Sequence, residues 1–274
     1  VAASGLPAKR LKQAGIDYLS ATIHSGSHAG YYPDALQMSI KITFSPADGK
    51  LLGAQIVGYS GVDKRIDEFS QVIKHSGTVY DLMALEQAYA PPFSSAKDPV
   101  AVTGYVAGNI LNGKMQPLYW RELQAADWSK VTLVDVRTPD EFALGALKGA
   151  VNIPLDDMRD RMKEIPRDKP VYLYCGVGLR GYLASNILLQ NGYQEVKNLI
   201  GGLKLYKAAT TPLPEPKEFS NSGSSSSDSS KVDHSEHSKD SAEAYTIASS
   251  VIPSMRAIKV DACGISCPGP IMKL

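Results

Sequence analysis

The region between residues 131 and 202 alternates short apolar segments with helical ones, and this alternation constrains the fold more than any other feature. The segments with the composition of buried strands are 131–136, 171–174 and 196–199. A helix start with a cap, Thr138 to Glu141, follows the first, and a helix over 180–190 follows the second. Strands that alternate with helices predict a parallel sheet covered on both faces.

The first region of the chain has a different pattern, which predicts an α+β domain over residues 1–112. Residues 36–44 alternate apolar and polar side chains, turn residues follow, and 51–59 resume an extended apolar pattern, so we expect a hairpin. Helical spacing of apolar residues over 62–75 and 98–111 predicts two helices that pack on that hairpin.

Composition excludes several classes of partner. The chain has 29 basic and 28 acidic residues, for a formal charge of +1, so nothing points to nucleic acid or an anionic membrane surface. No stretch approaches the roughly 18 apolar residues of a membrane span. The three cysteines do not suggest a disulfide framework, and we expect thiols in the cytoplasm.

Beyond residue 209 the composition changes. Residues 210–254 hold a serine-rich tract with little to bury, which predicts a flexible, disordered linker. Structure is expected to resume over 255–274, where a short strand at 258–260 leads to Cys263 and Cys267. Because both ends of the chain look cut, we interpret it as a fragment of a larger protein. We find no G-x-G-x-x-G motif after a predicted strand, so we expect no dinucleotide-binding module in this chain.

Cys175 is the strongest candidate for a reactive residue, because it ends a predicted strand and precedes a glycine-bearing turn and a helix. Ligands of open parallel sheets bind beyond the carboxyl ends of the strands. Backbone N–H groups turned inward, together with the positive end of the next helix, would stabilise a thiolate there. We therefore expect inward-facing amides and a thiol that is not sealed in the interior.

Four motifs over residues 115–209 resemble the rhodanese family in order and spacing. They are Asp135-Val-Arg137, Gly149-Ala-Val-Asn-Ile-Pro154, Cys175-Gly-Val-Gly-Leu-Arg180-Gly181 and Gly201-Gly202. The resemblance implies that Cys175 accepts sulfane sulfur as a persulfide, and that Arg180 closes the loop and meets anionic donors. It also implies that Asp135 and Arg137 shape the core beneath the loop, and it assigns substrate contacts to the remaining loop residues, Gly176, Val177, Gly178, Leu179 and Gly181.

Other readings of the same loop stay open. Phosphatases of this fold carry five residues between cysteine and arginine, whereas this loop has four, which favours sulfur transfer. A catalytically silent binding module and a merely buried thiol are the remaining alternatives.

The strings His28-Ala-Gly-Tyr31-Tyr32-Pro33 and Tyr89-Ala-Pro-Pro-Phe-Ser-Ser-Ala-Lys97-Asp98-Pro99 resemble the dimerisation domain of flavin-dependent coenzyme A disulfide reductases and persulfide reductases. This resemblance implies a homodimer formed through residues 1–112, in which Tyr31 and Tyr89 reach the partner's active site. FAD, NAD(P)H and coenzyme A are implied for the intact protein. The alternative is that both tyrosines only pack at a dimer interface.

The segment Asp261-Ala-Cys263-Gly-Ile-Ser-Cys267-Pro268-Gly-Pro270 resembles the start of a TusA-type sulfur carrier of α/β fold. The resemblance implies that Cys267 accepts sulfur and that Cys263 assists it. A linker of about 40 residues spans roughly 35 Å, enough for a handover from Cys175. A zinc site from His234, His237 and the two cysteines is the competing idea.

Two hypotheses about function follow. In the first, the chain is part of a disulfide or persulfide reductase whose rhodanese domain transfers sulfane sulfur from persulfide, polysulfide or thiosulfate to acceptor thiols. In the second, it is a non-catalytic dimerisation and sulfur-presenting module for partner proteins.

Overall fold

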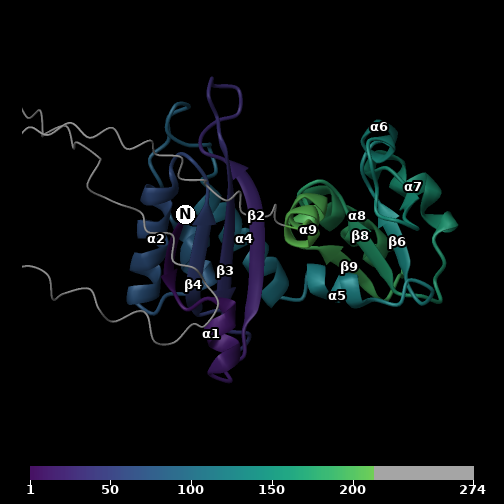
Figure 1. The fold of residues 1–274 in the computed structure, drawn as a ribbon, viewed down its shortest axis with the longest axis horizontal. Helices are drawn as coiled ribbons and strands as arrows, with labels where there is room; N and C mark the ends of the chain where they lie inside the picture. The colour runs from purple at the N-terminus through teal and green to yellow at the C-terminus, as the bar shows by residue number, and fades with distance from the viewer. Residues whose placement is uncertain (213–274) are drawn as a thin grey trace, which may run out of the picture. The chain divides into compact units, whose positions relative to one another are not determined.

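The computed structural model describes residues 1–212, which form two domains, each built on its own sheet (Figure 1). The elements of the first domain are β1 (Ala2–Gly5), α1 (Ala8–Gln13), β2 (Leu19–Gly26), β3 (Gln37–Phe44), β4 (Leu51–Val57), α2 (Val62–Lys74), α3 (Val79–Ala84) and α4 (Pro99–Leu111). The described residues end at 212. They exclude the predicted linker (210–254) from residue 213 onward, and the whole of the predicted sulfur-carrier start (255–274).

The first domain has a four-stranded antiparallel sheet in the order β1-β4-β3-β2. The predicted hairpin is confirmed as β3 and β4, and the two predicted helices are confirmed as α2 and α4. Strand β2 was not predicted, although its apolar residues, Leu19, Ala21 and Ile23, alternate with polar ones and so gave the signal of a strand. It pairs with β3 along its whole length, from Leu19 opposite Phe44 to Gly26 opposite Gln37.

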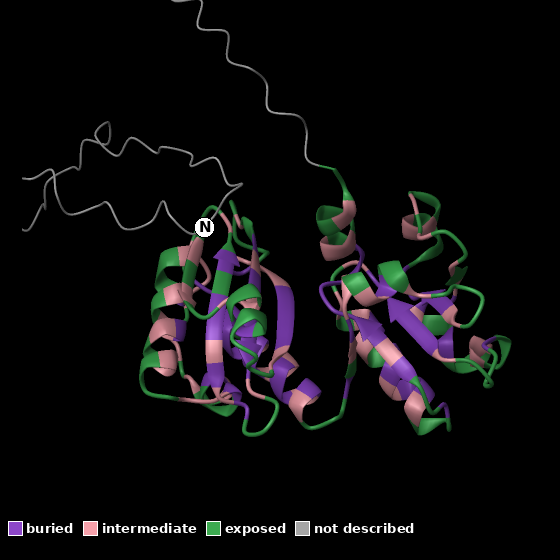
Figure 2. Cartoon of the chain, turned by 60° about the horizontal axis from the view of Figure 1, so that its bottom comes forward, coloured by how far each residue is buried: buried purple, intermediate pink, exposed green. Residues whose placement is uncertain are grey.

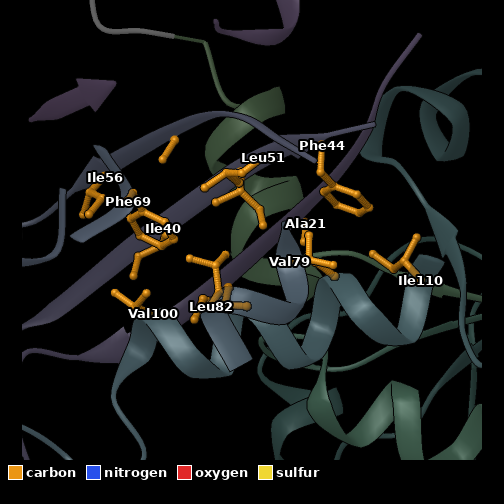
Figure 3. Close-up of a cluster of buried hydrophobic side chains, with 14 of the residues drawn as sticks. Ala21, Ile40, Phe44, Leu51, Ile56, Phe69, Val79, Leu82, Val100 and Ile110 are labelled. Atoms are coloured by element: carbon orange, nitrogen blue, oxygen red, sulfur yellow. The ribbon is translucent and has the colours of Figure 1, made fainter. Parts of the chain in front are cut away.

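The core of the first domain lies between the sheet and helices α2, α3 and α4 (Figure 3). Every second residue of β3 is buried on this side, as a period of two requires: Met38, Ile40, Ile42 and Phe44. The helices contribute buried apolar side chains such as Phe69, Val79, Leu82 and Val100. The antiparallel sheet thus has one face covered by helices, which defines an α+β domain.

The second domain is the predicted α/β unit. Its elements are β5 (Gln116–Leu118), α5 (Trp120–Ala125), β6 (Thr132–Asp135), α6 (Pro139–Ala143), β7 (Val151–Asn152), η1 (Leu155–Asp157), α7 (Met158–Arg161), η2 (Met162–Glu164), β8 (Val171–Tyr174), α8 (Leu179–Gln190), β9 (Val196–Leu199) and α9 (Gly202–Thr210). The strands form a five-stranded parallel sheet in the order β5-β9-β8-β6-β7.

Helices cover both faces of this sheet, and strand β8 is buried throughout (Figure 2). Val171 and Leu173 of β8 belong to a core with Leu188 of α8, whereas Tyr172 and Tyr174 pack with Leu203 of α9. Alternate side chains of one strand therefore serve two cores, which is the arrangement expected for a doubly covered sheet. The loop that follows β8 lies at the carboxyl edge of the sheet.

Within residues 1–212, no helix is long and apolar enough to cross a membrane. The same part of the chain holds no group of three or more His, Cys, Asp or Glu side chains arranged to bind a metal ion.

Candidate functional site

Cys175 lies directly after β8, at the start of the loop that leads into α8. Its Sγ accepts a hydrogen bond from the backbone N–H of Gly178, over 3.1 Å. The residue is only 1% exposed and packs with the core that contains Leu173 and Val136. The expectation that this thiol is not sealed in the interior is therefore wrong, because Cys175 is itself a member of the hydrophobic core of the second domain.

The start of α9 fixes the orientation of the first loop peptides. The N–H of Leu203 donates to the carbonyl of Cys175 over 2.8 Å, and the N–H of Lys204 donates to the carbonyl of Gly176 over 3.0 Å. In a trans peptide the carbonyl and the following N–H point in opposite directions. The N–H groups of Gly176 and Val177 therefore point away from α9.

Asn198 of β9 fixes the next turn of the loop in the same manner. Its Nδ2 donates to the carbonyl of Gly178 over 3.0 Å, so the N–H of Leu179 points away from β9. The side chain is buried, and no described group donates a hydrogen bond to its Oδ1. Sequence reasoning missed Asn198, although a polar residue inside a buried strand was the available signal.

Two glycines are required by close packing around the loop. A Cβ at Gly202 would lie 2.6 Å from the carbonyl oxygens of Cys175 and Gly176 and from the nitrogen of Val177, and its φ of +60° also favours glycine. Gly181, predicted to contact substrate, lies buried in α8, where a Cβ would lie 2.1 Å from the Oδ1 of Asn198. Glycine thus lets α8 and α9 approach the sheet closely enough to hold the loop.

Arg180 lies in the first turn of α8, and its partner is Glu141 of α6. The two terminal guanidinium nitrogens donate to the two carboxylate oxygens of Glu141, over 2.6 and 2.7 Å. These bonds outweigh partial burial and lower the pKa of Glu141 to about 2. The pKa of Arg180 is raised, mainly by its hydrogen bonds to Glu141. A Cβ built at Gly176 would lie 3.7 Å from Nη2 of Arg180, so the guanidinium lies beside the start of the loop.

Glu141 is held in place by the cap of its own helix. Its Oε2 accepts hydrogen bonds from the N–H and the hydroxyl of Thr138, over 3.1 and 3.2 Å. The predicted capping box is therefore confirmed, but one of its members has a second partner that the sequence did not indicate. Local spacing reveals a cap, whereas a contact between residues 39 positions apart depends on the tertiary fold.

The turn from Gly176 to Gly181 has the spacing G-x-G-x-x-G after a strand, a pattern that our sequence analysis overlooked. Its geometry does not fit FAD or a nicotinamide cofactor, because the thiol of Cys175 occupies the position that the turn surrounds. The third glycine serves helix packing, as it does in dinucleotide-binding turns. The expectation that the chain holds no dinucleotide-binding module assumed that the motif is absent, so it stays a prediction.

Asp135 and Arg137, expected to shape the core beneath the loop, form a buried ion pair at the end of β6. Arg137 donates from Nε and Nη2 to the carboxylate of Asp135, and from Nη2 to the carbonyl of Gly145 over 2.9 Å. The pair thus connects the strand end with the segment that follows α6.

Tyr31 and Tyr89, which lie 58 positions apart, form a hydrogen-bonded pair in the first domain, with 2.6 Å between the hydroxyl oxygens. Both side chains are open to solvent, with 76% and 48% exposure. The hydrogen bond with Tyr31 raises the pKa of Tyr89. Two phenols that share a proton in this way are available to a partner that approaches the surface.

A buried ion pair that the sequence did not reveal aligns the two tyrosine loops. Arg65 is fully buried and donates to both carboxylate oxygens of Asp98, over 3.1 and 2.9 Å. It also donates to the carbonyl of Ser27, before Tyr31, over 2.9 Å, while Asp98 accepts from Ser94, after Tyr89, over 2.7 Å. Burial alone would raise the pKa of Asp98, but these hydrogen bonds bring it below its usual value.

The remaining candidates, Cys263 and Cys267 with the alternative histidine ligands, lie outside the described residues. The structure therefore brings together Cys175, Gly178 and Arg180 at one place, and Tyr31 and Tyr89 at another.

Comparison with known families assigns both domains. Residues 119–209 match the rhodanese-like domain, and residues 1–100 match the pyridine nucleotide-disulphide oxidoreductase dimerisation domain. A sulfurtransferase from Allochromatium vinosum is 42% identical over 91 residues, which make up 33% of this chain and 85% of that protein.

Two solved structures resemble the chain across both domains. The reduced Bacillus anthracis CoADR-RHD is 47% identical, with a TM-score of 0.73, over 75% of this chain and 37% of that one. An NAD-dependent persulfide reductase from A. fulgidus is 34% identical, with a TM-score of 0.67, over 74% and 36%. The chain spans 24% of the length of a coenzyme A disulfide reductase from Staphylococcus epidermidis, with 39% identity over 107 residues, or 39% of this chain.

Proposed function

The chain belongs to the rhodanese-like domain family through residues 119–209, and from this premise we propose that Cys175 transfers sulfane sulfur as a persulfide. The observation that carries the proposal is the hydrogen bond from the N–H of Gly178 to the Sγ of Cys175. A donor aimed at the sulfur favours its negatively charged form, and the thiolate is the nucleophile in sulfur exchange.

The reaction has two steps that balance without a further oxidant. The thiolate of Cys175 attacks the outer sulfur of a donor R–S–SH, a new S–S bond forms, and the donor's S–S bond breaks. The leaving thiolate R–S⁻ takes the electron pair, and the enzyme carries Cys–S–SH. An acceptor thiolate then attacks the outer sulfur of this persulfide, which regenerates the thiolate of Cys175.

The loop residues stabilise the negative charge that both steps place on sulfur. The N–H groups of Gly176, Val177 and Leu179 are turned away from the elements that bind the loop carbonyls. Helix α8, of 12 residues, begins within the loop, and the positive end of its dipole favours an anion there. The outer persulfide sulfur needs the same stabilisation as the resting thiolate, so one arrangement serves the whole cycle.

For the longer protein of which this chain covers a part, we propose disulfide or persulfide reduction with FAD and NAD(P)H, with coenzyme A as the thiol carrier. The names of the relatives support this assignment, and the flavin chemistry would belong to residues outside this chain. In that protein the first domain forms a homodimer, and Tyr31 and Tyr89 donate a hydrogen bond to a leaving thiolate or persulfide.

A further step of the proposal is the delivery of sulfur to Cys267 as an acceptor, with Cys263 as an auxiliary thiol. The motif around Cys267 supports this step, since a proline after the cysteine suits the first turn of a helix.

A transfer assay on the chain as it stands tests the proposal. Thiosulfate and glutathione persulfide are offered as donors with cyanide as acceptor, and the wild type is compared with Cys175→Ser and with Cys263→Ser as a matched cysteine control. We expect Cys175→Ser to lose turnover and Cys263→Ser to keep it. Equal turnover in all three would refute the enzyme and favour the non-catalytic presenting module.

Mass spectrometry of the protein after exposure to polysulfide follows the path of the sulfur. A gain of one sulfur atom on Cys175 supports the first step, and a later gain on Cys267 supports the handover. A gain on Cys267 in the Cys175→Ser variant would show that this cysteine loads independently.

A further inference from the structure

The ion pair of Arg180 with Glu141 has a consequence for the donors that reach Cys175. Arg180 is the single charged residue of the loop 175–181, and both of its terminal nitrogens are engaged by one carboxylate. A positive charge that would attract an anionic donor is thereby balanced at a distance of 2.6 Å. The formal charge of the pair is zero.

The other exposed side chains of this loop add no charge. Leu179 is 65% exposed and Val177 is partly exposed, and both belong to the loop itself. Leu144 after α6 and Leu183 in α8 are exposed apolar residues of the neighbouring segments. Val177 and Leu179 thus form an apolar rim beside a neutralised guanidinium. The exposed Lys204 of α9, whose N–H donates to the carbonyl of Gly176, is a separate positive charge near the loop.

Separating Glu141 from Arg180 costs free energy. Its carboxylate is held at the same time by the N–H and the hydroxyl of Thr138, which fix it at the start of α6. An anion that takes over the guanidinium must replace two charge-assisted hydrogen bonds, each stronger than a bond between neutral groups. The carboxylate therefore competes with any anionic donor for Arg180.

We propose that Glu141 is a positioning residue that determines donor specificity, because it occupies Arg180 and so disfavours donors in proportion to the negative charge beside their transferable sulfur. The inference rests on the proposed sulfur transfer at Cys175. It assigns to the site donors with little charge beside that sulfur, such as organic persulfides, in preference to the thiosulfate dianion.

Two inorganic or small organic donors that deliver the same sulfur test this inference. Thiosulfate, with charge −2, gives the Cys175 persulfide and sulfite, and methanethiosulfonate, with charge −1, gives the persulfide and methanesulfinate. In each case the Cys175 thiolate forms the new S–S bond, and the leaving anion takes the electron pair of the bond that breaks. The wild type should have a higher KM for thiosulfate than for methanethiosulfonate.

Replacement of the carboxylate by an amide should change KM according to donor charge. Gln also suits the third position of a capping box, so Glu141→Gln keeps the cap. We expect the KM for thiosulfate to fall about fivefold. This estimate takes the interaction of one unit charge with each donor charge about 4 Å away in water, and halves it because Gln still pairs partly with Arg180. The KM for methanethiosulfonate should fall about twofold, while kcat changes less than twofold for either donor.

Two further variants separate charge from structure. Glu141→Asp keeps charge and cap, as Asp81 does in the capping box of α3, and should restore the wild-type ratio of the two KM values. Glu164→Gln is the matched control, because Glu164 forms the same two-bond pair with Arg161 in a different element. It should leave both KM values unchanged.

The outcomes are distinct. A rise in both KM values or an equal fall in kcat for both donors in Glu141→Gln would reduce Glu141 to a structural support and overturn the inference. If Glu141→Gln does not fold, a lower wild-type KM for thiosulfate than for methanethiosulfonate overturns it by itself. Turnover that survives Cys175→Ser would instead refute the proposed function, whatever the KM values.

Discussion

The contact that most directly connects the fold with the reactive sulfur is the hydrogen bond from Asn198 to the carbonyl of Gly178. The N–H of the same Gly178 donates to the Sγ of Cys175. These two bonds hold the peptide units before and after Gly178. Loss of the bond from Asn198 leaves Gly178 free to rotate, which weakens the bond from its N–H to Cys175. We therefore predict that Asn198→Ala reduces persulfide formation although Asn198 does not touch the sulfur.

The size of the effect follows from the bond that is lost. A neutral hydrogen bond contributes about 0.5–1.5 kcal/mol net, and a carbonyl left without a partner costs about 1–3 kcal/mol. Part of this cost is offset, because the Oδ1 of Asn198 has no partner among the described residues and is removed as well. A net change of about 1–2 kcal/mol in the loop corresponds to a decrease of about 5–30-fold in kcat/KM.

The assay is the rate of Cys175 persulfide formation at limiting donor, measured together with the free energy of unfolding in urea. Asn186→Ala is the matched control, because Nδ2 of Asn186 also donates to a backbone carbonyl, that of Tyr182, over 3.0 Å. It should keep the wild-type rate. A rate for Asn198→Ala within twofold of the wild type, at any stability, would refute the argument that this bond orients the loop.

Three further predictions concern other contacts. Arg65→Met leaves the carboxylate of Asp98 buried without its partner, so the free energy of unfolding should fall by about 3–5 kcal/mol at pH 7. Because the bonds in the wild type lower the pKa of Asp98, their contribution is present above the unfolded value of 3.8 and is lost as the pH falls through the lower folded value, so urea denaturation should show a smaller difference at about pH 3 than at pH 7. Gly202→Ala places a Cβ 2.6 Å from the carbonyl of Cys175, and should abolish measurable sulfur transfer while circular dichroism still shows the fold. Because the pKa of Glu141 is about 2, well below its ordinary 4.5, its pair is lost only as the pH falls toward 2, so the KM difference produced by Glu141→Gln should stay constant in steady-state assays from pH 5 to 8.

Three strands of the parallel sheet could be predicted from the sequence, because β6 and β8 are rich in buried apolar residues and β9 carries an apolar residue at each end. Strands β8 and β9 have the predicted bounds, 171–174 and 196–199. Strand β7 has only two residues, Val151 and Asn152, and was not predicted. So short a strand has no periodicity of its own, and its pairing with β6 depends on the neighbouring strand.

The candidate site could be predicted only where its residues lie close together in the sequence. Cys175, Gly178 and Arg180 share one turn, and the family motif places them together. Glu141 and Asn198 come from other elements, and their side chains meet the loop only after the sheet has formed. The sequence alone shows the cap that Glu141 forms and the polarity of Asn198. It does not show which distant residue either side chain contacts.

The low exposure of Cys175 is compatible with catalysis if the closed site is the resting state of a reactive thiol. A thiolate that is open to solvent reacts with oxidants, and the outer sulfur of a persulfide is more exposed to them than the thiolate that bears it. Here Cys175 is covered by the core in which it packs, and the pairing of Arg180 with Glu141 stands against small multivalent anions. A donor that contacts the apolar rim at Leu179 gains binding energy from groups remote from the reacting sulfur, and that energy can open the loop. Selection of the donor then follows from the pair, so a variant that loosens it should gain kcat/KM with thiosulfate through a lower KM, with kcat nearly unchanged.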